Sequence, residues 1–252
     1  MDFNYKKPTH LFAMLAVLAA FFMLIGLSLL TFFNMLPTTS TSQLSSLSEN
    51  SRFFVEIFTL VIQLLIVVIG IFLIVPLLWY TLVNKFSLRQ IFDKLQLRLK
   101  GIDKALLWGI LAVFAGFAIT IVINLLIIQW SGIDAESLSN IPDLEQIFSP
   151  ISLYILVAVQ PIGEEIFFRG FLLDKITSVS GPKTAMVTTS VLFGLSHLSY
   201  GMAYTAVMAG ALGLIFAFVV MKTKNLYASI VAHIAINVIS LTIYFLDKSL
   251  GL

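Results

Sequence analysis

The sequence predicts an all-α fold, a polytopic transmembrane helical bundle of about seven spans. Of its 252 residues, 59% are hydrophobic and only 11% are charged, and the mean hydropathy is +1.02. These values lie outside the range of soluble globular domains. The net charge of +2 is too small to indicate a nucleic-acid partner. The expected surroundings of the chain are therefore a lipid bilayer.

Apolar runs that match the length of a bilayer crossing, about 20 residues, recur along the chain. They place spans at residues 11–33, 53–83, 105–130, 150–173, 184–200, 201–221 and 226–246. The first run is too long for the apolar part of a signal peptide, and no small-residue cleavage site follows it, so we expect a retained span. The second run contains Pro76 and should tilt or kink; counting it as two helices gives eight spans. The boundary between the fifth and sixth spans is the least clearly marked.

The charges of the connecting segments predict the orientation. Lys and Arg residues gather near the N-terminus and in segments 84–104, 174–183 and 222–225. The alternating segments are poor in them: segment 37–52 holds one Arg, and segment 131–149 holds no basic residue but contains Asp134, Glu136, Asp143 and Glu145. Because cytoplasmic loops concentrate basic residues, we expect a multi-pass protein of the cell membrane with a cytoplasmic N-terminus and an exterior C-terminus.

The segment between the second and third spans has the pattern of a surface helix. Its polar residues surround an apolar face made of Leu88, Phe92, Leu95 and Leu99. Such a helix would lie on the inner leaflet, and a cytoplasmic extension of the second span fits the pattern equally well. This segment is the last part of a predicted N-terminal region, residues 1–104. We expect residues 105–252 to form a C-terminal bundle.

Small residues repeat at every fourth position in the sixth predicted span, Ala206 with Gly210 and Ala209 with Gly213. This spacing lets a neighbouring membrane helix approach closely. We therefore expect tight packing among the C-terminal helices.

Three charges lie within one hexapeptide of the fourth span, at Glu164, Glu165 and Arg169. A lone charge at the centre of a membrane helix costs roughly 2.5 to 3.5 kcal/mol, so such residues are expected to be functional or paired. Glu165 and Arg169 are four residues apart, with the acid first, which favours an ion pair that supports the structure. Glu164 lies about 100° further round the helix and remains for another role.

Further polar residues in the spans predict the rest of a site. His197 lies in the fifth span, and His233 and Asn237 share one face of the seventh. Either histidine alone would be explained equally well by a hydrogen bond to a backbone carbonyl. At about 1.5 Å per residue, these three residues and Glu164 lie about 10 to 20 Å from the predicted inner ends of their helices. We expect them to converge on one cavity that opens to the cytosol, with the Glu164 carboxylate roughly 4 to 7 Å from both imidazoles.

A carboxylate, two imidazoles and an amide suit hydrolysis by an activated water. Glu164 can take a proton from water, the histidines can orient that water or move its proton, and Asn237 can donate to the developing oxyanion. The same Glu164, His197 and His233 could instead be three ligands of a divalent metal such as Zn²⁺, with water in the open position. The sequence does not separate a metal-dependent from a metal-independent mechanism.

The three motifs Glu164-Glu165-x-x-x-Arg169, Phe193-x-x-x-His197 and His233-x-x-x-Asn237 resemble those of the CAAX protease and bacteriocin-processing family (CPBP, or Abi) of intramembrane proteases. The resemblance covers about the last hundred residues, with the motifs in 150–246. It implies a protease that cleaves a membrane-associated protein or peptide, in which Glu164, His197, His233 and Asn237 are catalytic and Glu165 and Arg169 complete the first motif. Members of the family are called metalloproteases, whereas the eukaryotic relatives resemble enzymes in which a glutamate activates water.

Other functions remain open on the residues alone. The spans hold no His-Glu-x-x-His motif and no pair of aspartates, which excludes two other intramembrane protease classes. A rhomboid-like serine protease would use Ser196 with a histidine but would leave both glutamates without a role. A transporter with a Glu/His proton relay or a non-catalytic scaffold or immunity protein would explain the buried charges without hydrolysis. Nothing in the sequence selects a substrate.

Overall fold

The computed structural model describes residues 3–35, 47–132, 138–198 and 203–251, and all regular secondary structure within these ranges is helical. The helices are α1 (Pro8–Phe21), α2 (Leu27–Phe32), α4 (Glu49–Ile62), α5 (Val75–Leu78), α6 (Leu88–Lys94), α7 (Ile102–Ser131), α8 (Ile141–Glu145), α9 (Pro150–Glu165), α10 (Leu173–Ser180), α11 (Pro182–Leu195), α12 (Ala203–Thr223) and α13 (Tyr227–Leu250). Wider, π-helical turns continue some of them: Phe22–Gly26, Gln63–Ile74, Trp79–Val83 and Ile166–Leu172. The predicted all-α membrane bundle is thus confirmed.

In the described part of the chain, six continuous helices are long and apolar enough to cross a membrane, rather than seven. They are Pro8–Phe32, Glu49–Val83, Ile102–Trp130, Pro150–Ser180, Ala203–Thr223 and Tyr227–Leu250. The predicted span 184–200 corresponds to α11, which has 14 residues and so measures about 21 Å, less than the hydrocarbon thickness of about 30 Å. Its predicted boundary with the next span falls at 199–202, outside the described residues, as do Asp134 and Glu136.

The second run is one helix and not two. Pro76 lies in the first turn of α5, directly after the π-helical segment Gln63–Ile74. Proline has no N–H to donate to the preceding turn, and a wider turn is a common way for a helix to accommodate such an interruption. The run therefore continues to Val83, and the count of eight spans does not apply.

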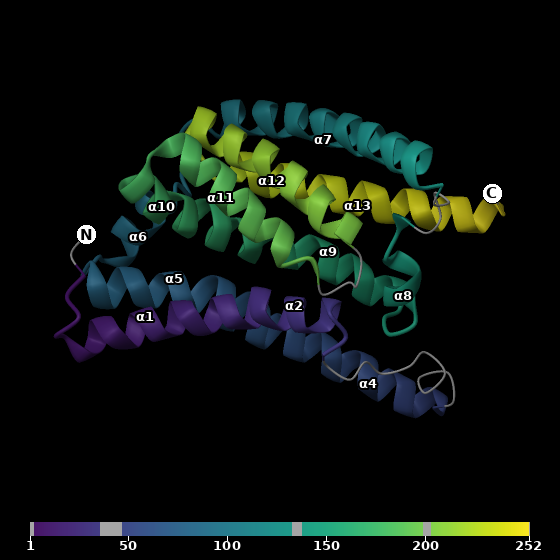
Figure 1. Ribbon diagram of the computed structural model, residues 1–252, viewed down its shortest axis with the longest axis horizontal. Coiled ribbons are helices and arrows are strands. Elements are labelled where there is room, and N and C mark those ends of the chain that lie inside the picture. The colour runs from purple at the N-terminus through teal and green to yellow at the C-terminus, as the bar shows by residue number, and fades with distance from the viewer. Residues whose placement is uncertain (1–2, 36–46, 133–137, 199–202, 252) are drawn as a thin grey trace.

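The helices pack in an order that places α9 at the centre of the bundle (Figure 1). On one side, α9 contacts the second membrane helix, which in turn packs against α1. On the other side, α9 contacts α13, which packs against α7 and α12, and α12 packs closely against α11. Large apolar side chains such as Phe114, Ile121 and Leu125 are exposed on the outer face of α7, as expected for a surface that faces lipid.

The segment predicted to be an amphipathic surface helix forms α6, which is only seven residues long. Ser87 and Gln90 begin it with a reciprocal capping box. The predicted face divides, because Leu95 is buried against the core while Leu88 and Phe92 are exposed. The alternative, an extension of the second span, is excluded because that helix ends at Val83.

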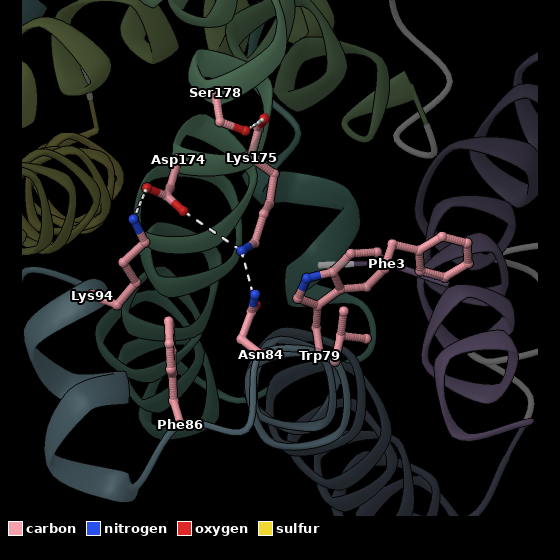
Figure 2. Close-up of a pocket in the computed structure, with 9 residues that line it drawn as sticks. Phe3, Trp79, Asn84, Phe86, Lys94, Asp174, Lys175 and Ser178 are labelled. Atoms are coloured by element: carbon pink, nitrogen blue, oxygen red, sulfur yellow. Dashed lines mark hydrogen bonds and ion pairs between the residues drawn. The ribbon is translucent and has the colours of Figure 1, made fainter. Parts of the chain in front are cut away.

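A polar cluster joins the end of the second membrane helix, α6 and α10 (Figure 2). Asp174 accepts from Lys94 at 2.8 Å and lies 3.7 Å from Lys175. Lys175 also donates to Asn84 at 3.3 Å, and its ammonium lies 4.3 Å from the centre of the Tyr80 ring. These contacts connect residues on both sides of position 104; the proposed division of the chain there stays a prediction.

Tight packing between α11 and α12 confirms the prediction from the small-residue pattern. A Cβ atom on Gly194 would lie 2.5 Å from the backbone oxygen of Ala206 and 3.3 Å from the backbone of Gly210. Such separations are too short for a side chain, so only glycine permits this approach of the two helices. The contact fixes the position of the chain just before His197.

Candidate active site

Helix α9 carries the first motif, and its beginning is fixed by polar contacts. Ser149 caps the helix, and its hydroxyl and backbone N–H donate to Glu56 at 2.5 Å and 2.8 Å. Pro161 lies inside α9, and the π-helical segment Ile166–Leu172 begins directly after the helix ends at Glu165. The glutamates therefore stand where regular helix gives way to a wider turn, a feature often found at functional sites.

Glu165 and Arg169 form the predicted ion pair at 2.8 Å, and both side chains are fully buried. The guanidinium carbon of Arg169 also lies 4.2 Å from the centre of the Phe193 ring and 5.4 Å from that of Phe216. A cation held against aromatic faces gains further stabilisation. This layer of charge and aromatic rings seals the bundle on one side of the site.

Glu165 has a second partner that the sequence did not indicate. Nδ1 of His233 lies 3.0 Å from the Glu165 carboxylate. A carboxylate paired with Arg169 accepts hydrogen bonds only, so the Nδ1 atom carries the proton and donates it to this bond. In the neutral ring, Nε2 is then the unprotonated nitrogen, and it lies 3.7 Å from Oε2 of Glu164.

Glu164 points to a different side of the helix from Glu165, as expected from the angle of about 100° between successive helix positions. Its other oxygen, Oε1, accepts a hydrogen bond from the Gln160 side chain at 2.7 Å. Gln160 in turn accepts from the Gln63 side chain at 2.9 Å. Neither glutamine is among the site residues predicted from the sequence. Gln160 could have been found from its position four residues before Glu164, on the same helix face.

His197 follows directly after α11. Its Nδ1 atom donates a hydrogen bond to the backbone oxygen of Phe193 at 2.8 Å. The Phe193 ring contacts both imidazoles. Its centre lies 4.6 Å from that of His197 and 5.8 Å from that of His233. The hydroxyl of Ser196 donates to the same Phe193 oxygen at 2.8 Å.

One cavity of about 340 Å³ brings the predicted residues together. Its lining includes Glu164, His197, His233 and Asn237, together with Gln160 and many apolar side chains. Glu165 and Arg169 are not part of this lining. The structure thus separates the six predicted residues into four that face one cavity and two that lie behind it.

The cavity extends in the direction opposite to the one predicted. From Glu164 it follows α9 back toward Leu153 and α13 forward to Leu241, and it reaches Asn140 and Leu144 at the start of α8 and within it. These residues lie at the end of the bundle that carries α8, not at the end that carries α6 and α10, near which the basic residues gather (Figure 1). The depth of each residue along its helix predicted that the four residues share one level of the bundle. It could not predict that the Glu165–Arg169 pair closes the cavity toward the basic end.

The metal site is not preformed. Among the described residues, no three His, Asp or Glu side chains are grouped so that they could hold a metal ion. Nδ1 of each imidazole is directed to another acceptor, Glu165 or the Phe193 oxygen. A histidine that donates through Nδ1 in this way can still bind a metal through Nε2, so these bonds do not argue against Glu164, His197 and His233 as ligands, and a bound zinc ion stays a prediction.

Comparison with known proteins supports the resemblance found in the motifs. Residues 146–239 match the family described as Type II CAAX prenyl endopeptidase Rce1-like. A stretch of 110 residues is 33% identical to "Putative membrane peptidase YdiL" of Bacillus subtilis (strain 168), covering 42% of this chain and 43% of that protein. A stretch of 84 residues is 32% identical to "UPF0177 protein YxdF" of Lactococcus lactis subsp. lactis (strain IL1403), covering 33% of this chain and 45% of that protein.

The chain thus spans less than half the length of these curated relatives. No solved structure gives a significant match. The family match includes Glu164, His197, His233 and Asn237, the four predicted residues that line the cavity. The predicted resemblance is therefore confirmed: segment 146–239 is similar to the family described as Type II CAAX prenyl endopeptidase Rce1-like.

Proposed function

We propose that this protein is a membrane-embedded endopeptidase in which Glu164 activates the hydrolytic water. The observation that carries the proposal is the 3.7 Å separation between Oε2 of Glu164 and Nε2 of His233, at the wall of a cavity that His197 and Asn237 also line. With Glu164 ionised and the His233 ring neutral, both atoms are hydrogen-bond acceptors. A water molecule that donates one proton to each would be held between them and polarised.

The proposed reaction needs only these side chains. Glu164 takes a proton as the water oxygen forms a bond to the scissile carbonyl carbon, and the Asn237 amide donates to the oxyanion that develops. The carbon–nitrogen bond then breaks, and the proton held by Glu164 passes to the leaving amine. His233, fixed by Glu165, and His197 hold the water and the oxyanion in position. No step is assigned to a metal.

The proposed substrate is a membrane-associated protein or peptide. The cavity wall is mostly apolar, with Leu153, Leu156 and Met208 among its members. A mostly apolar cavity with a few polar groups favours a ligand that buries an apolar segment and presents a polar bond to those groups. The names of the matched family and of YdiL, a prenyl endopeptidase and a membrane peptidase, agree with this substrate class.

Two alternatives are less well supported. A rhomboid-like mechanism needs Ser196 in the cavity, but its hydroxyl donates to the Phe193 backbone and is not part of the lining. A scaffold or transporter would also retain the buried Glu165–Arg169 pair. A scaffold differs from the peptidase in not requiring Glu164 for its biological effect, and a transporter differs in yielding no cleavage products.

The proposal is tested by comparing cells that carry the wild-type chain with cells that carry Glu164→Gln, which keeps the shape and removes the base. Membrane and secreted peptides are profiled in both, and the amount of the protein in the membrane is measured. We expect the same accumulation and the loss of specific cleavage products. The matched control is Asp103→Asn, at an exposed carboxylate in the first turn of α7, which should leave the products unchanged. An unchanged profile with Glu164→Gln would favour a scaffold.

The proposed orientation, with the N-terminus cytoplasmic and the C-terminus exterior, rests on the distribution of charged loops. Under this orientation the cavity extends toward the exterior face. Reporter fusions after residue 145 and at the C-terminus should therefore give exterior signals, and a fusion after residue 100 a cytoplasmic signal. A cytoplasmic signal after residue 145 would reverse the orientation and turn the cavity toward the cytosol.

A further inference from the structure

We infer that Gln160 and Gln63 are positioning residues that orient the Glu164 carboxylate, an inference that rests on the function proposed above. The three side chains form one continuous path across the interface between α9 and the second membrane helix. Gln63 donates to Gln160 at 2.9 Å, and Gln160 donates to Oε1 of Glu164 at 2.7 Å. The path ends at Oε1, whereas Oε2 is the oxygen that faces His233.

The direction of the path follows from the chemistry of its end. A carboxylate can only accept, so the Gln160 amide must present its NH₂ group to Glu164. Its carbonyl oxygen then points to the second membrane helix, where it needs a donor. Gln63 supplies this donor, which makes the opposite orientation of the Gln160 amide unfavourable: it would place an oxygen against the carboxylate. Gln63 thus acts on Glu164 through Gln160.

The local packing holds the two glutamines within reach of each other. Gly163 lies next to Glu164, and a Cβ atom on it would be 3.0 Å from Phe72 and 3.1 Å from Val68 of the second membrane helix. The glycine therefore permits a close approach of the two helices one turn from Gln160. An amide at membrane depth without a hydrogen-bond partner is costly, and here each glutamine has its partner in the other helix.

In the proposed reaction the two carboxylate oxygens of Glu164 have different roles. The bond from Gln160 occupies Oε1 and fixes the rotation of the carboxylate, so Oε2 remains directed to Nε2 of His233 and to the water between them. Without Gln160 the carboxylate would be free to rotate, and the water would be held in a productive geometry for less of the time.

The first test is spectroscopic and needs no substrate. The carboxylate stretching band of Glu164 is identified in infrared difference spectra of the full-length protein as the band that Glu164→Gln removes. We expect this band to shift in Gln160→Leu and, by a smaller amount, in Gln63→Leu. The matched control is Tyr154→Phe, which removes another α9 contact between helices, the 3.0 Å hydrogen bond to Thr242, and should leave the band in place. A band unchanged in Gln160→Leu overturns the inference.

The second test is kinetic and uses fluorogenic peptides with apolar residues on both sides of the cleaved bond. In metal sites, loss of the hydrogen-bond partner that orients a ligand typically costs about 10- to 100-fold. We expect a loss of the same order in kcat for Gln160→Leu, with KM little changed. Gln63→Leu should lose less, and the double variant should be no worse than Gln160→Leu alone, because one residue acts through the other. Tyr154→Phe should keep the wild-type kcat.

The two tests separate this inference from the proposed function. Additive losses in the double variant, or a fall in membrane accumulation that matches the loss of activity, would show that the glutamines only hold the helices together and would overturn the inference. The opposite result is also possible. If the infrared band shifts in Gln160→Leu but the wild type cleaves none of the peptides and shows no Glu164-dependent products, the hydrogen-bonded path is confirmed and the proposed peptidase activity is rejected.

Discussion

The two sides of the glutamate pair differ in nearly every physical respect. Toward the basic end of the bundle, Glu165 and Arg169 are fully buried among phenylalanine rings. Toward the α8 end, Glu164 faces a cavity of about 340 Å³. Adjacent residues on a helix point about 100° apart, so one step along the chain changes the surroundings from sealed to accessible. We propose that the sealed side stabilises the fold and that the cavity side carries the residues of the proposed reaction.

His233 is the residue that belongs to both sides. Its Nδ1 atom donates to Glu165 on the sealed side, and its Nε2 atom faces Glu164 on the cavity side. A histidine held by a buried carboxylate has a fixed tautomer and a fixed ring orientation. The sealed side therefore also determines how the cavity side presents its imidazole.

The largest expected effect comes from breaking the sealed pair. Arg169→Ala strands the buried Glu165 carboxylate, and removing one partner of a buried pair costs about 3 to 5 kcal/mol. We expect a large fall in membrane accumulation and in the melting temperature of the detergent-solubilised protein, and a similar fall for Glu165→Gln. Glu164→Gln should retain the wild-type stability.

A matched control is the Lys248–Glu145 pair, in which the lysine side chain is 59% exposed. Exposed pairs contribute about 0 to 1 kcal/mol, so Lys248→Ala should change the melting temperature little. If Glu164→Gln failed to accumulate while Glu165→Gln stayed folded and inactive, the roles of the two glutamates would have to be exchanged.

An intermediate effect is expected at Gly213, which makes room for the sealed pair. A Cβ atom there would lie 2.9 Å from Nη2 of Arg169 and 3.3 Å from the Phe193 ring. Overpacking of this kind costs about 1 to 3 kcal/mol, and Gly213→Ala should lower the melting temperature accordingly. Gly210→Ala is the control one turn away: its Cβ would meet Ser190 at 3.5 Å, an ordinary contact. Equal melting temperatures for the two variants would show that the Arg169 side chain can move aside.

The residues that were predictable from the sequence are those whose signal is local. Glu165 and Arg169 are four apart on one helix, and the pair forms as spacing predicts. Charges at membrane depth are costly, which singled out Glu164, and His233 with Asn237 share a face. The roles assigned to these residues stay predictions, because geometry alone does not establish catalysis.

Features that depend on packing between distant segments could not be predicted. The contact between Gln63 and Gln160 joins positions 97 apart, and one amide in an apolar run gives no sign of its partner. The extent of the cavity depends on which helices close each end, so the predicted opening toward the basic loops was wrong. The end of α11 at Leu195 was hidden because only a short mixed segment separates it from the next apolar run of the sequence.

The smallest expected effect lies at the α8 end, where Glu145 contacts the last helix. Tyr244 and Lys248 donate to its carboxylate at 2.6 Å and 2.8 Å. Burial alone would raise the pKa of Glu145, but these hydrogen bonds and the Lys248 charge outweigh it and hold the pKa below its ordinary value. A carboxyl with a lower pKa in the folded than in the unfolded state stabilises the fold above the unfolded pKa, about 4.3, and loses this contribution as the pH falls through the folded pKa.

Comparing Lys248→Met with the wild type isolates this contribution, because the other carboxylates titrate alike in both proteins. At neutral pH and low salt the wild type should melt at a slightly higher temperature. The difference should shrink as the pH falls below about 4.3 and should also shrink when salt is added at neutral pH, since exposed pairs are screened. A difference that stayed constant across this pH range would mean that Lys248 stabilises the end of α13 by packing against Tyr244, whose ring centre lies 5.9 Å from its ammonium, and not through the charge of Glu145.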